Sequence, residues 1–283
     1  MKLLITTHPF NEDTSKFPGE VIYNTKGSKY TQEEINELLI KENPDYIIAG
    51  TEKYGKEQIE NCKNLKVISR LGVGTTSIDH HVCKNKGIKI LITPDAPTNA
   101  VAELAMTNIL SLLKRITQQE MWSKKQGREI SECVIGIVGY GRIGKRLHEL
   151  IKVFTPKKVL ICDPTYNNTS CVEKVFKESD VVTLHTPELD QIIDKRLLDQ
   201  TKDECIIVNT ARADIINYDH LIEWLIERPS SSAAIDVFNI EPNDGKEFEN
   251  LKNVILTPHI GSYTTRTRKL MEKQSFENIM EVV

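Results

Sequence analysis

Short apolar runs alternate with amphipathic segments along the whole of this chain. In the first third, the runs that we expect to form strands occupy residues 2–7, 45–50, 66–70 and 88–92. A second series of such runs occupies residues 133–138, 158–162, 180–184, 205–209, 233–237 and 253–257. Strands that alternate with helical patterns are typical of parallel sheets in α/β proteins. The pattern therefore predicts an α/β fold with two doubly wound parallel-sheet units, the second with six strands.

The polar positions also mark helices between the strands. Residues 31–34 read Thr-Gln-Glu-Glu, a capping box that predicts the start of a helix. A long helix capped by Thr98 or Asn99 is predicted to link the two series, because its apolar positions over 101–116 follow the helical period. Such a linking helix serves either as a dimer surface or as a buried element between its own domains. Residues 264–283 form the last predicted helix.

Composition and charge limit the possible partners. The chain has 283 residues, of which 39% are hydrophobic and 27% charged, and its net charge is −3. This is the balance of an ordinary globular protein, and it argues against a nucleic-acid or membrane-surface partner. The apolar start at residues 1–6 is too short for a secretory core. Six cysteines without paired ligand spacing fit a reducing cytoplasm, and His80 and His81 have no further ligand nearby in sequence, so we expect a cytoplasmic protein with no metal site.

A glycine motif follows the strand-like run at 133–138. Residues 139–144 read Gly-Tyr-Gly-Arg-Ile-Gly, and they open an amphipathic helix that leads to the next strand and to Asp163. Strand, glycine turn, helix, strand and acid occur in the order that a dinucleotide-binding fold requires. The alternative is a plain βαβ turn with structural glycines. The predicted cofactor-binding positions of this segment are Gly139, Gly141, Arg142, Ile143, Gly144 and Asp163.

Each of these residue types suits the binding of a dinucleotide. Gly139 permits a tight turn, Gly141 lets the backbone approach the diphosphate, and Gly144 lets the helix pack close to the strand. The N–H groups at the helix N-terminus then face the phosphates. Asp163 is expected to accept hydrogen bonds from the ribose hydroxyls and to repel a 2′-phosphate, so the predicted cofactor is NAD rather than NADP.

Three charged or titratable residues follow three successive strands of the second series. They are Arg212, Glu241 and His259. Ligands of open α/β sheets bind at the carboxyl ends of the strands, where these side chains are predicted to lie. Taken singly, each residue has a structural alternative. His259 could be a hydrogen-bonded histidine of a loop, and Arg212 could be the partner of a surface ion pair. Together with the glycine motif, they predict a catalytic set.

The motifs resemble those of the D-isomer-specific 2-hydroxyacid dehydrogenase family. The resemblance covers nearly the whole chain and includes the spacing of the Arg, Glu and His described above, as well as the segments at 69–74, 93–97 and 99–104. It implies a flavodoxin-like substrate domain at residues 1–96, completed by the helix at 264–283. It also implies a Rossmann-like NAD-binding domain at residues 97–263 and a homodimer.

The resemblance implies a role for each catalytic position. His259 is the acid and base for the substrate oxygen, and Glu241 pairs with its imidazole and favours the imidazolium form. Arg212 holds the substrate carboxylate and polarises the carbonyl. The N–H groups of Val73 and Gly74 hold the same carboxylate. The implied partner is therefore a small 2-hydroxy or 2-keto acid.

Further positions are assigned to NAD by the same resemblance. Asp236 faces the nicotinamide carboxamide, Thr210 lies near the cofactor, and the chain at 185–187 passes the adenine. The set on this side of the sheet is His185, Thr186, Pro187, Thr210, Asp236 and Gly261. The loop after Pro187 is shorter than is usual in the family, so adenine contacts are expected to differ.

The substrate side departs from the family's pattern in two places. Thr76 and Ser77 stand where the family more often carries Asp-Asn. Phosphoglycerate dehydrogenases often place an arginine after the strand at 45–49, whereas here Glu52 would repel a phosphate and Lys53 would attract one. The N-terminal half nevertheless reads most like enzymes named for phosphoglycerate.

We therefore predict an NAD-dependent dehydrogenase of a small 2-hydroxy acid such as 3-phosphoglycerate. The alternatives are a glyoxylate or hydroxypyruvate (glycerate) reductase and a non-catalytic NAD(H)-responsive binding protein of the co-repressor type.

Overall fold

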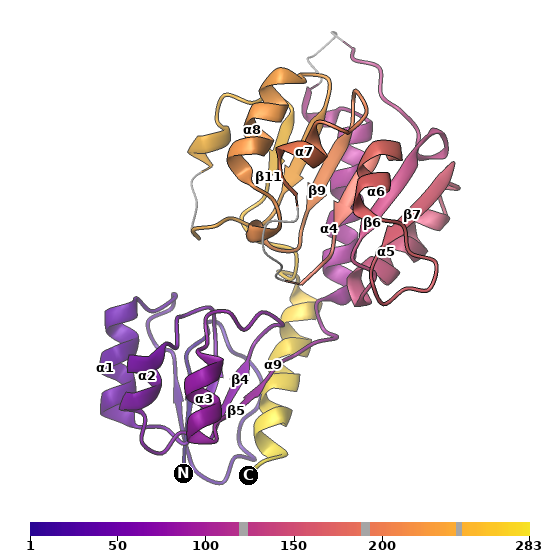
Figure 1. Cartoon of the computed structure of the whole chain (residues 1–283). Coiled ribbons are helices and arrows are strands. Elements are labelled where there is room, and N and C mark those ends of the chain that lie inside the picture. Colours follow the sequence, from indigo (N-terminus) through magenta and orange to yellow (C-terminus); the bar gives the residue numbers. More distant parts are fainter. Residues whose placement is uncertain (119–123, 188–192, 242–244) are drawn as a thin grey trace. The chain divides into compact units, whose positions relative to one another are not determined.

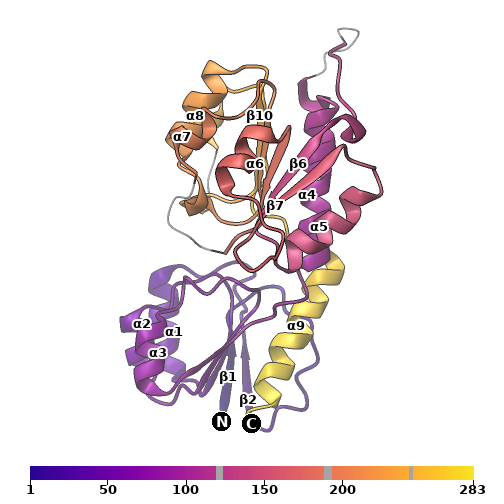
Figure 2. The same ribbon diagram turned by 45° about the vertical axis from the view of Figure 1, so that its right-hand side comes forward.

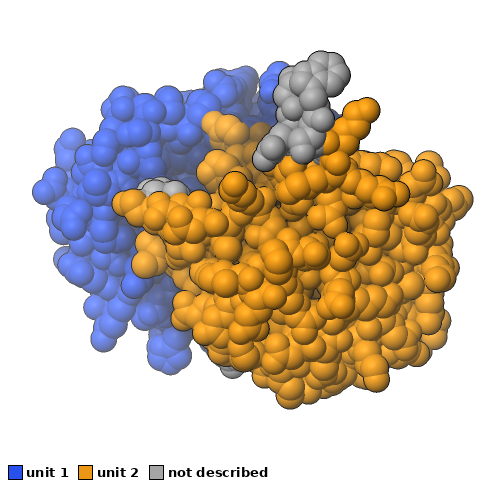
Figure 3. Space-filling view, turned by 90° about the horizontal axis from the view of Figure 1, so that it is seen from above, with its two compact units in different colours: residues 1–97, 264–283 blue, residues 98–263 orange. Residues whose placement is uncertain are grey.

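The chain forms two compact units, each built on its own parallel sheet. The computed structural model describes residues 1–118, 124–187, 193–241 and 245–283. Unit 1 comprises Met1–Pro97 with Thr264–Val283, and unit 2 comprises Thr98–Tyr263 (Figure 3). Both sheets are doubly wound, which confirms the predicted α/β fold class. Among the described residues, no helix has the length and apolar character needed to cross a membrane.

Unit 1 contains a five-stranded sheet in the order β2-β1-β3-β4-β5. All of its neighbouring strands pair in parallel, which is the strand order of flavodoxin-like folds. Its strands are β1 (Lys2–Ile5), β2 (Glu20–Tyr23), β3 (Tyr46–Ala49), β4 (Val67–Arg70) and β5 (Lys89–Leu91). The pattern of apolar runs predicts four of these strands and misses β2.

Helices cover both faces of the unit 1 sheet. Helices α1 (Gln32–Glu42), α2 (Lys56–Asn61) and α3 (His80–Lys86) lie on one face, and α9 (Thr265–Met280) lies on the other (Figure 1). The predicted capping box at α1 is confirmed. The Glu34 N–H donates to the Thr31 hydroxyl at 3.3 Å, and the Thr31 N–H donates to the Glu34 carboxylate at 2.7 Å. These reciprocal bonds satisfy two N–H groups that the helix itself leaves unpaired.

Unit 2 contains a six-stranded parallel sheet in the order β11-β10-β9-β8-β6-β7. All six predicted strands are present, as β6 (Val134–Val138), β7 (Lys158–Cys162), β8 (Val181–Leu184), β9 (Ile206–Asn209), β10 (Ser232–Ile235) and β11 (Val254–Leu256). The chain moves from β6 to β7 on one side and then to β8 on the other. The strand order therefore reverses between β6 and β8, the place where open α/β sheets bind ligands.

Helices also cover both faces of the unit 2 sheet. Helices α4 (Thr98–Leu113) and α5 (Arg142–Lys152) lie on one face, and α6 (Val172–Glu178), α7 (Lys195–Leu198) and α8 (Tyr218–Glu227) lie on the other (Figure 2). The predicted cap of the linking helix is wrong, because α4 begins at Thr98 and both proposed caps lie within it. The Asn99 side chain instead accepts a hydrogen bond from Arg146 Nε at 2.8 Å, which ties α4 to α5.

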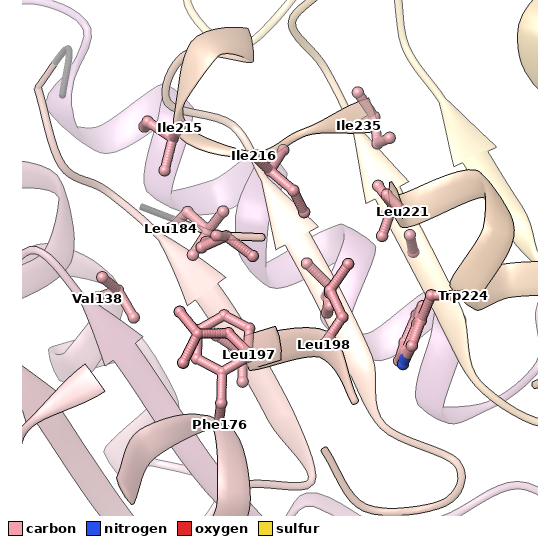
Figure 4. Packing of buried hydrophobic residues seen from close by; sticks show 14 of the residues in the cluster. Val138, Phe176, Leu184, Leu197, Leu198, Ile215, Ile216, Leu221, Trp224 and Ile235 are labelled. Carbon is pink, nitrogen blue, oxygen red and sulfur yellow. The ribbon is translucent and has the colours of Figure 1, made fainter. Parts of the chain in front are cut away.

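The larger core of unit 2 holds the strand ends in place. Val138, Leu184 and Ile235 are the last residues of β6, β8 and β10, and they pack in one cluster with Phe176 and Trp224 from the covering helices (Figure 4). The indole N–H of Trp224 donates to the Thr201 hydroxyl at 3.1 Å, so its polar atom is satisfied inside the core. Interiors packed in this way resist displacement, which gives the loops at the carboxyl edge a rigid base.

Candidate active site

The glycine loop between β6 and α5 is packed tightly at two of its three glycines. Gly139 has a φ of 91°, and a Cβ there would lie 2.5 Å from the carbonyl carbon of His185. A Cβ on Gly144 would overlap the carbonyl oxygen of Gly139. At Gly141, in contrast, a Cβ would meet nothing within 4 Å. Gly141 thus presents bare backbone on an open side of the loop, as a ligand that approaches the main chain requires.

Helix α5 begins directly after this open position. Gly141 is its N-cap, and Arg142, Ile143 and Gly144 form its first turn. The N–H groups of a first turn have no acceptor within their own helix, and the helix dipole places partial positive charge there. The Arg142 side chain is exposed, whereas Ile143 is half-buried against the core. This arrangement is suited to the diphosphate of NAD.

Asp163 lies at the end of β7, beside the glycine loop. Its carboxylate accepts hydrogen bonds from the Tyr140 N–H at 2.6 Å, the Thr165 N–H at 2.8 Å and the Thr165 hydroxyl at 2.6 Å. The Thr165 hydroxyl above all, helped by the two N–H groups, lowers the pKa of Asp163. Asp163 is therefore an ionised acceptor. A carboxylate offers roughly four acceptor positions, so one remains for a ribose hydroxyl.

The ends of β8 and β9 present three buried polar atoms that face no partner among the described residues. They are His185 Nδ1, Thr186 Oγ1 and Thr210 Oγ1. Burial lowers the pKa of His185 to about 3, so its ring is neutral. A buried polar atom without a partner costs about 1–3 kcal/mol, which a bound polar group can offset. These residues fit NAD. Pro187 is exposed, and the shortened loop at 188–192 lies outside the described residues.

Asp236, which follows β10, holds the loop after β11 through three hydrogen bonds. Its carboxylate accepts from the Thr257 hydroxyl at 2.5 Å and from the N–H groups of Ile260 and Gly261, both at 2.9 Å. Burial raises the pKa of Asp236, although these bonds oppose the shift. The loop that it fixes contains His259, whose φ of 52° is uncommon for a residue other than glycine.

His259 makes a direct contact with Glu241. The Nδ1 atom of the imidazole lies 2.7 Å from Oε2 of Glu241, and the other carboxylate oxygen accepts the Phe238 N–H at 3.0 Å. Because a carboxylate only accepts hydrogen bonds, Nδ1 carries the proton of this contact. The contact fixes the ring and leaves Nε2 as the atom that exchanges a proton with a ligand.

Arg212 follows β9 and is positioned by Asn209. The Asn209 side chain donates to the Arg212 carbonyl at 2.8 Å and accepts the Ala211 N–H at 3.1 Å. The guanidinium itself donates to the Ala211 carbonyl at 2.7 Å. Strands β9, β10 and β11 are neighbours, so Arg212, Asp236 and His259 come from adjacent strands at one sheet edge.

The sequence did not identify two residues that shape this edge, Asn209 and Thr257. Each is a polar residue at or just after the end of an apolar strand, and that position was the available signal. The assignment of Arg212, Glu241 and His259 to catalytic roles stays a prediction.

In unit 1, Val73 and Gly74 lie in the loop after β4. No described residue accepts a hydrogen bond from either N–H group. The preceding Gly72 has a φ of 138°, and its N–H donates to the Thr93 hydroxyl at 2.8 Å, which fixes the start of the loop. Two successive backbone donors of this kind are suited to a carboxylate.

Comparisons with known proteins agree with these features. A family model described as "D-isomer specific 2-hydroxyacid dehydrogenase, NAD binding domain" matches residues 102–261. Hydroxypyruvate reductase of Thermotoga maritima is 32% identical, over 96% of this chain and 96% of that protein. D-3-phosphoglycerate dehydrogenase of Methanocaldococcus jannaschii is 32% identical over 100% of this chain, which spans 58% of that protein.

A solved structure shows the same architecture. The NAD⁺-bound 3-phosphoglycerate dehydrogenase of Entamoeba histolytica superposes with a TM-score of 0.86 at 27% identity, over 99% of this chain and 94% of that chain. The chain therefore belongs to the D-isomer specific 2-hydroxyacid dehydrogenase family, and it is an NAD-dependent oxidoreductase that acts on the CH–OH group of 2-hydroxy acids.

Proposed function

We propose that this chain reduces a small 2-keto acid with NADH and oxidises the matching D-2-hydroxy acid with NAD⁺, by means of Arg212, Glu241 and His259. The observation that carries the proposal is the 2.7 Å contact between Glu241 and His259 at the carboxyl edge of the unit 2 sheet. A carboxylate that holds one ring nitrogen makes the other a positioned acid and base. Unit 2 is proposed to bind NAD, and unit 1 to contribute to substrate binding.

Each residue has a distinct part in the proposed reaction. NAD(H), when bound, supplies or accepts the hydride. His259 donates a proton from Nε2 to the keto oxygen during reduction and takes it back during oxidation, while Glu241 stabilises the charged ring. Arg212 binds the substrate carboxylate with its planar donors and polarises the carbonyl. The N–H groups of Val73 and Gly74 bind the carboxylate as well.

The candidate substrates are hydroxypyruvate, glyoxylate and 3-phosphohydroxypyruvate, with their hydroxy-acid counterparts. The names of two relatives, one for hydroxypyruvate and one for phosphoglycerate, support acids of three carbons. All three candidates share the carboxylate and the adjacent carbonyl on which the proposed residues act. They differ in what is attached to the carbonyl carbon: hydrogen in glyoxylate, a hydroxymethyl group in hydroxypyruvate and its phosphate ester in 3-phosphohydroxypyruvate. The proposed proton transfer by His259 does not depend on this group.

Activity of two variants tests the proposal. Arg212→Ala and His259→Ala are expected to lower kcat/KM for every active 2-keto acid by several orders of magnitude and to leave NADH binding largely intact. The exposed Arg196 and His81 offer matched controls, Arg196→Ala and His81→Ala, whose rates should equal that of the wild type. Wild-type rates in either active-site variant would refute the assignment.

We also propose a homodimer. Helix α4 packs on the sheet of its own unit, and close to its C-terminal end Ile116 is 60% exposed. In the segment after α5, Val153 is 79% and Phe154 43% exposed. Contiguous exposed apolar patches mark protein–protein contacts, and these side chains are proposed to be part of such a patch. Light scattering coupled to size-exclusion chromatography tests this, and a monomer at micromolar concentration would contradict it.

A further inference from the structure

The peptide group between Val237 and Phe238 is held at both of its polar atoms. Its carbonyl oxygen accepts a hydrogen bond from the Tyr218 hydroxyl at 2.5 Å. Its N–H donates to Oε1 of Glu241 at 3.0 Å. A peptide group is planar, so a bond that fixes the direction of its carbonyl also fixes the direction of its N–H. The Tyr218 hydroxyl therefore sets the direction from which the Glu241 carboxylate is held.

The same carboxylate holds the proposed acid and base. Oε2 of Glu241 lies 2.7 Å from Nδ1 of His259. A continuous series of hydrogen bonds thus leads from Tyr218 through one peptide group and one carboxylate to the imidazole. Hydrogen bonds in such a series polarise one another, so a donor at the peptide carbonyl makes the peptide N–H a stronger donor to Glu241.

The Tyr218 hydroxyl also contacts the group that fixes the loop of Arg212. Nδ2 of Asn209 lies 3.5 Å from this hydroxyl, and the same amide nitrogen donates to the Arg212 carbonyl at 2.8 Å. A hydroxyl donates one hydrogen bond and has two acceptor positions, so it can take part in both contacts. One hydroxyl therefore lies between the chain that follows β9 and the chain that follows β10.

The surroundings of Tyr218 fix its ring and keep its hydroxyl protonated. The residue is 6% exposed, and its ring packs edge-on against Phe248 with the ring centroids 5.8 Å apart. Burial raises the pKa of this hydroxyl, and the charges of Glu247, Glu241 and Asp214 add to the shift. The hydroxyl is therefore a hydrogen-bond donor at neutral pH. Its loss would leave the packing of the ring in place.

We propose that Tyr218 is a positioning residue for proton transfer, and that its hydroxyl orients Glu241 through the peptide group between Val237 and Phe238. The inference rests on the proposed function, because it takes Glu241 and His259 to be the pair that transfers the proton. Without the hydroxyl, the peptide group is free to turn, and Glu241 holds the imidazole less well. Nε2 of His259 is then displaced from the position at which it exchanges a proton with the substrate.

Reductive kinetics of Tyr218→Phe test the proposal. With hydroxypyruvate or glyoxylate, kcat should fall about 5- to 50-fold, because a displacement of up to about 1 Å costs a proton-transfer group up to about 100-fold. The Kd for NADH and the KM for the keto acid should stay within about twofold of the wild-type values, since the glycine loop and the Arg212 guanidinium are unaltered.

The pH dependence of the rate gives a second readout. A displaced Glu241 stabilises the imidazolium less, so the rate of reduction by Tyr218→Phe should fall to half at a pH about 0.5–1 lower than in the wild type. Asp236 also interacts electrostatically with His259, and it is unchanged in the variant. A residue that only supported the fold would not shift this pH.

Trp224→Phe is the matched control. Trp224 lies on the same helix and is 2% exposed, and its substitution also removes one buried hydrogen bond, the one to Thr201 at 3.1 Å. Both variants should lower the Tm by about 2–8 °C. Only Tyr218→Phe should change kcat and its pH dependence. If that variant does not fold, Tyr218→Met fills the site without a donor and gives the same comparison.

The outcomes separate this inference from the proposed function. It is overturned if Tyr218→Phe keeps the wild-type kcat or the wild-type pH dependence. It is also overturned if Trp224→Phe shows the same changes. In each of these cases the wild type is active, so the proposed function stands. If the wild type reduces neither hydroxypyruvate, glyoxylate nor 3-phosphohydroxypyruvate while NADH still binds, the proposed function fails, and this inference fails with it.

Discussion

Two glycines of the same loop are expected to respond differently to alanine. Gly139→Ala should destabilise the fold, whereas Gly141→Ala should leave the fold nearly intact and weaken NADH binding. The difference follows from the surroundings, because a Cβ at position 139 would meet the backbone of residues 185 and 186 at 2.5–2.6 Å, and a Cβ at position 141 would meet nothing within 4 Å.

The magnitudes follow from backbone conformation and overlap. At Gly139, the φ of 91° costs an alanine about 1–2 kcal/mol, and the overlap with backbone adds about 1–3 kcal/mol. The expected loss of unfolding free energy is therefore about 2–5 kcal/mol. Gly141 has a φ of −73°, which alanine adopts freely. Its cost is about 0.5–1 kcal/mol, because alanine is a poorer N-cap than glycine.

Thermal unfolding and NADH titration measure the two effects. A loss of 1 kcal/mol shifts the Tm of a domain of this size by about 2–4 °C. Gly139→Ala should lower the Tm by about 5–15 °C and Gly141→Ala by less than about 4 °C. The Gly141 methyl would occupy the side from which the diphosphate approaches, so the Kd for NADH should rise at least about tenfold, or about 1.4 kcal/mol.

Alanine at a third glycine separates the cost of the positive φ from the cost of steric overlap. Gly87 has a φ of 71°, and a Cβ there would meet nothing within 4 Å, so Gly87→Ala carries the backbone cost alone. Its Tm should fall between those of the other two variants, with unchanged NADH affinity. Equal Tm values for Gly139→Ala and Gly141→Ala, or wild-type NADH binding by Gly141→Ala, would refute the reasoning.

Other predictions concern pH and the loop that contains His259. Burial holds the pKa of His185 at about 3, whereas an unfolded chain binds that proton near pH 6.5, so unfolding free energy measured by denaturant should fall as pH drops from about 6.5 toward 3. His185→Gln should flatten this slope. Asp236→Asn should lower both Tm and kcat, because an amide cannot accept all three of the donors that Asp236 binds. The rate of reduction should fall with rising pH and the rate of oxidation should increase, and identical profiles in stopped-flow assays would contradict the role of His259.

The sheet of unit 2 could be predicted from sequence because its strands are buried on both faces. Such strands form nearly continuous apolar runs, as in β9, where all four residues are buried. Strand β2 gave no such signal, since it lies at the sheet edge with no fully buried residue. Helices α2 and α3 are six and seven residues long and bury few side chains, so they show no helical period.

The residue types of the site could be predicted, and the family resemblance also implied that Glu241 pairs with His259. The two residues follow different strands, so the residue pattern alone does not show their contact, which the folded sheet places at 2.7 Å. The positive φ of His259 depends on bonds from backbone N–H groups to the side chain of Asp236, which a one-dimensional pattern does not encode. The role of Asp236 at the nicotinamide, implied by the family resemblance, stays a prediction, and the structure shows that Asp236 fixes the loop of the proposed acid.

Single-turnover transfer of deuterium from NADH labelled at C4 of the nicotinamide tests the central claim most directly. With hydroxypyruvate or glyoxylate, the account predicts deuterium on C2 of the 2-hydroxy product, with the D configuration in the case of glycerate. Arg212→Ala and His259→Ala should bind the labelled NADH and transfer the label far more slowly. The account would be contradicted if the wild type transferred no deuterium, or if either variant transferred it at the wild-type rate.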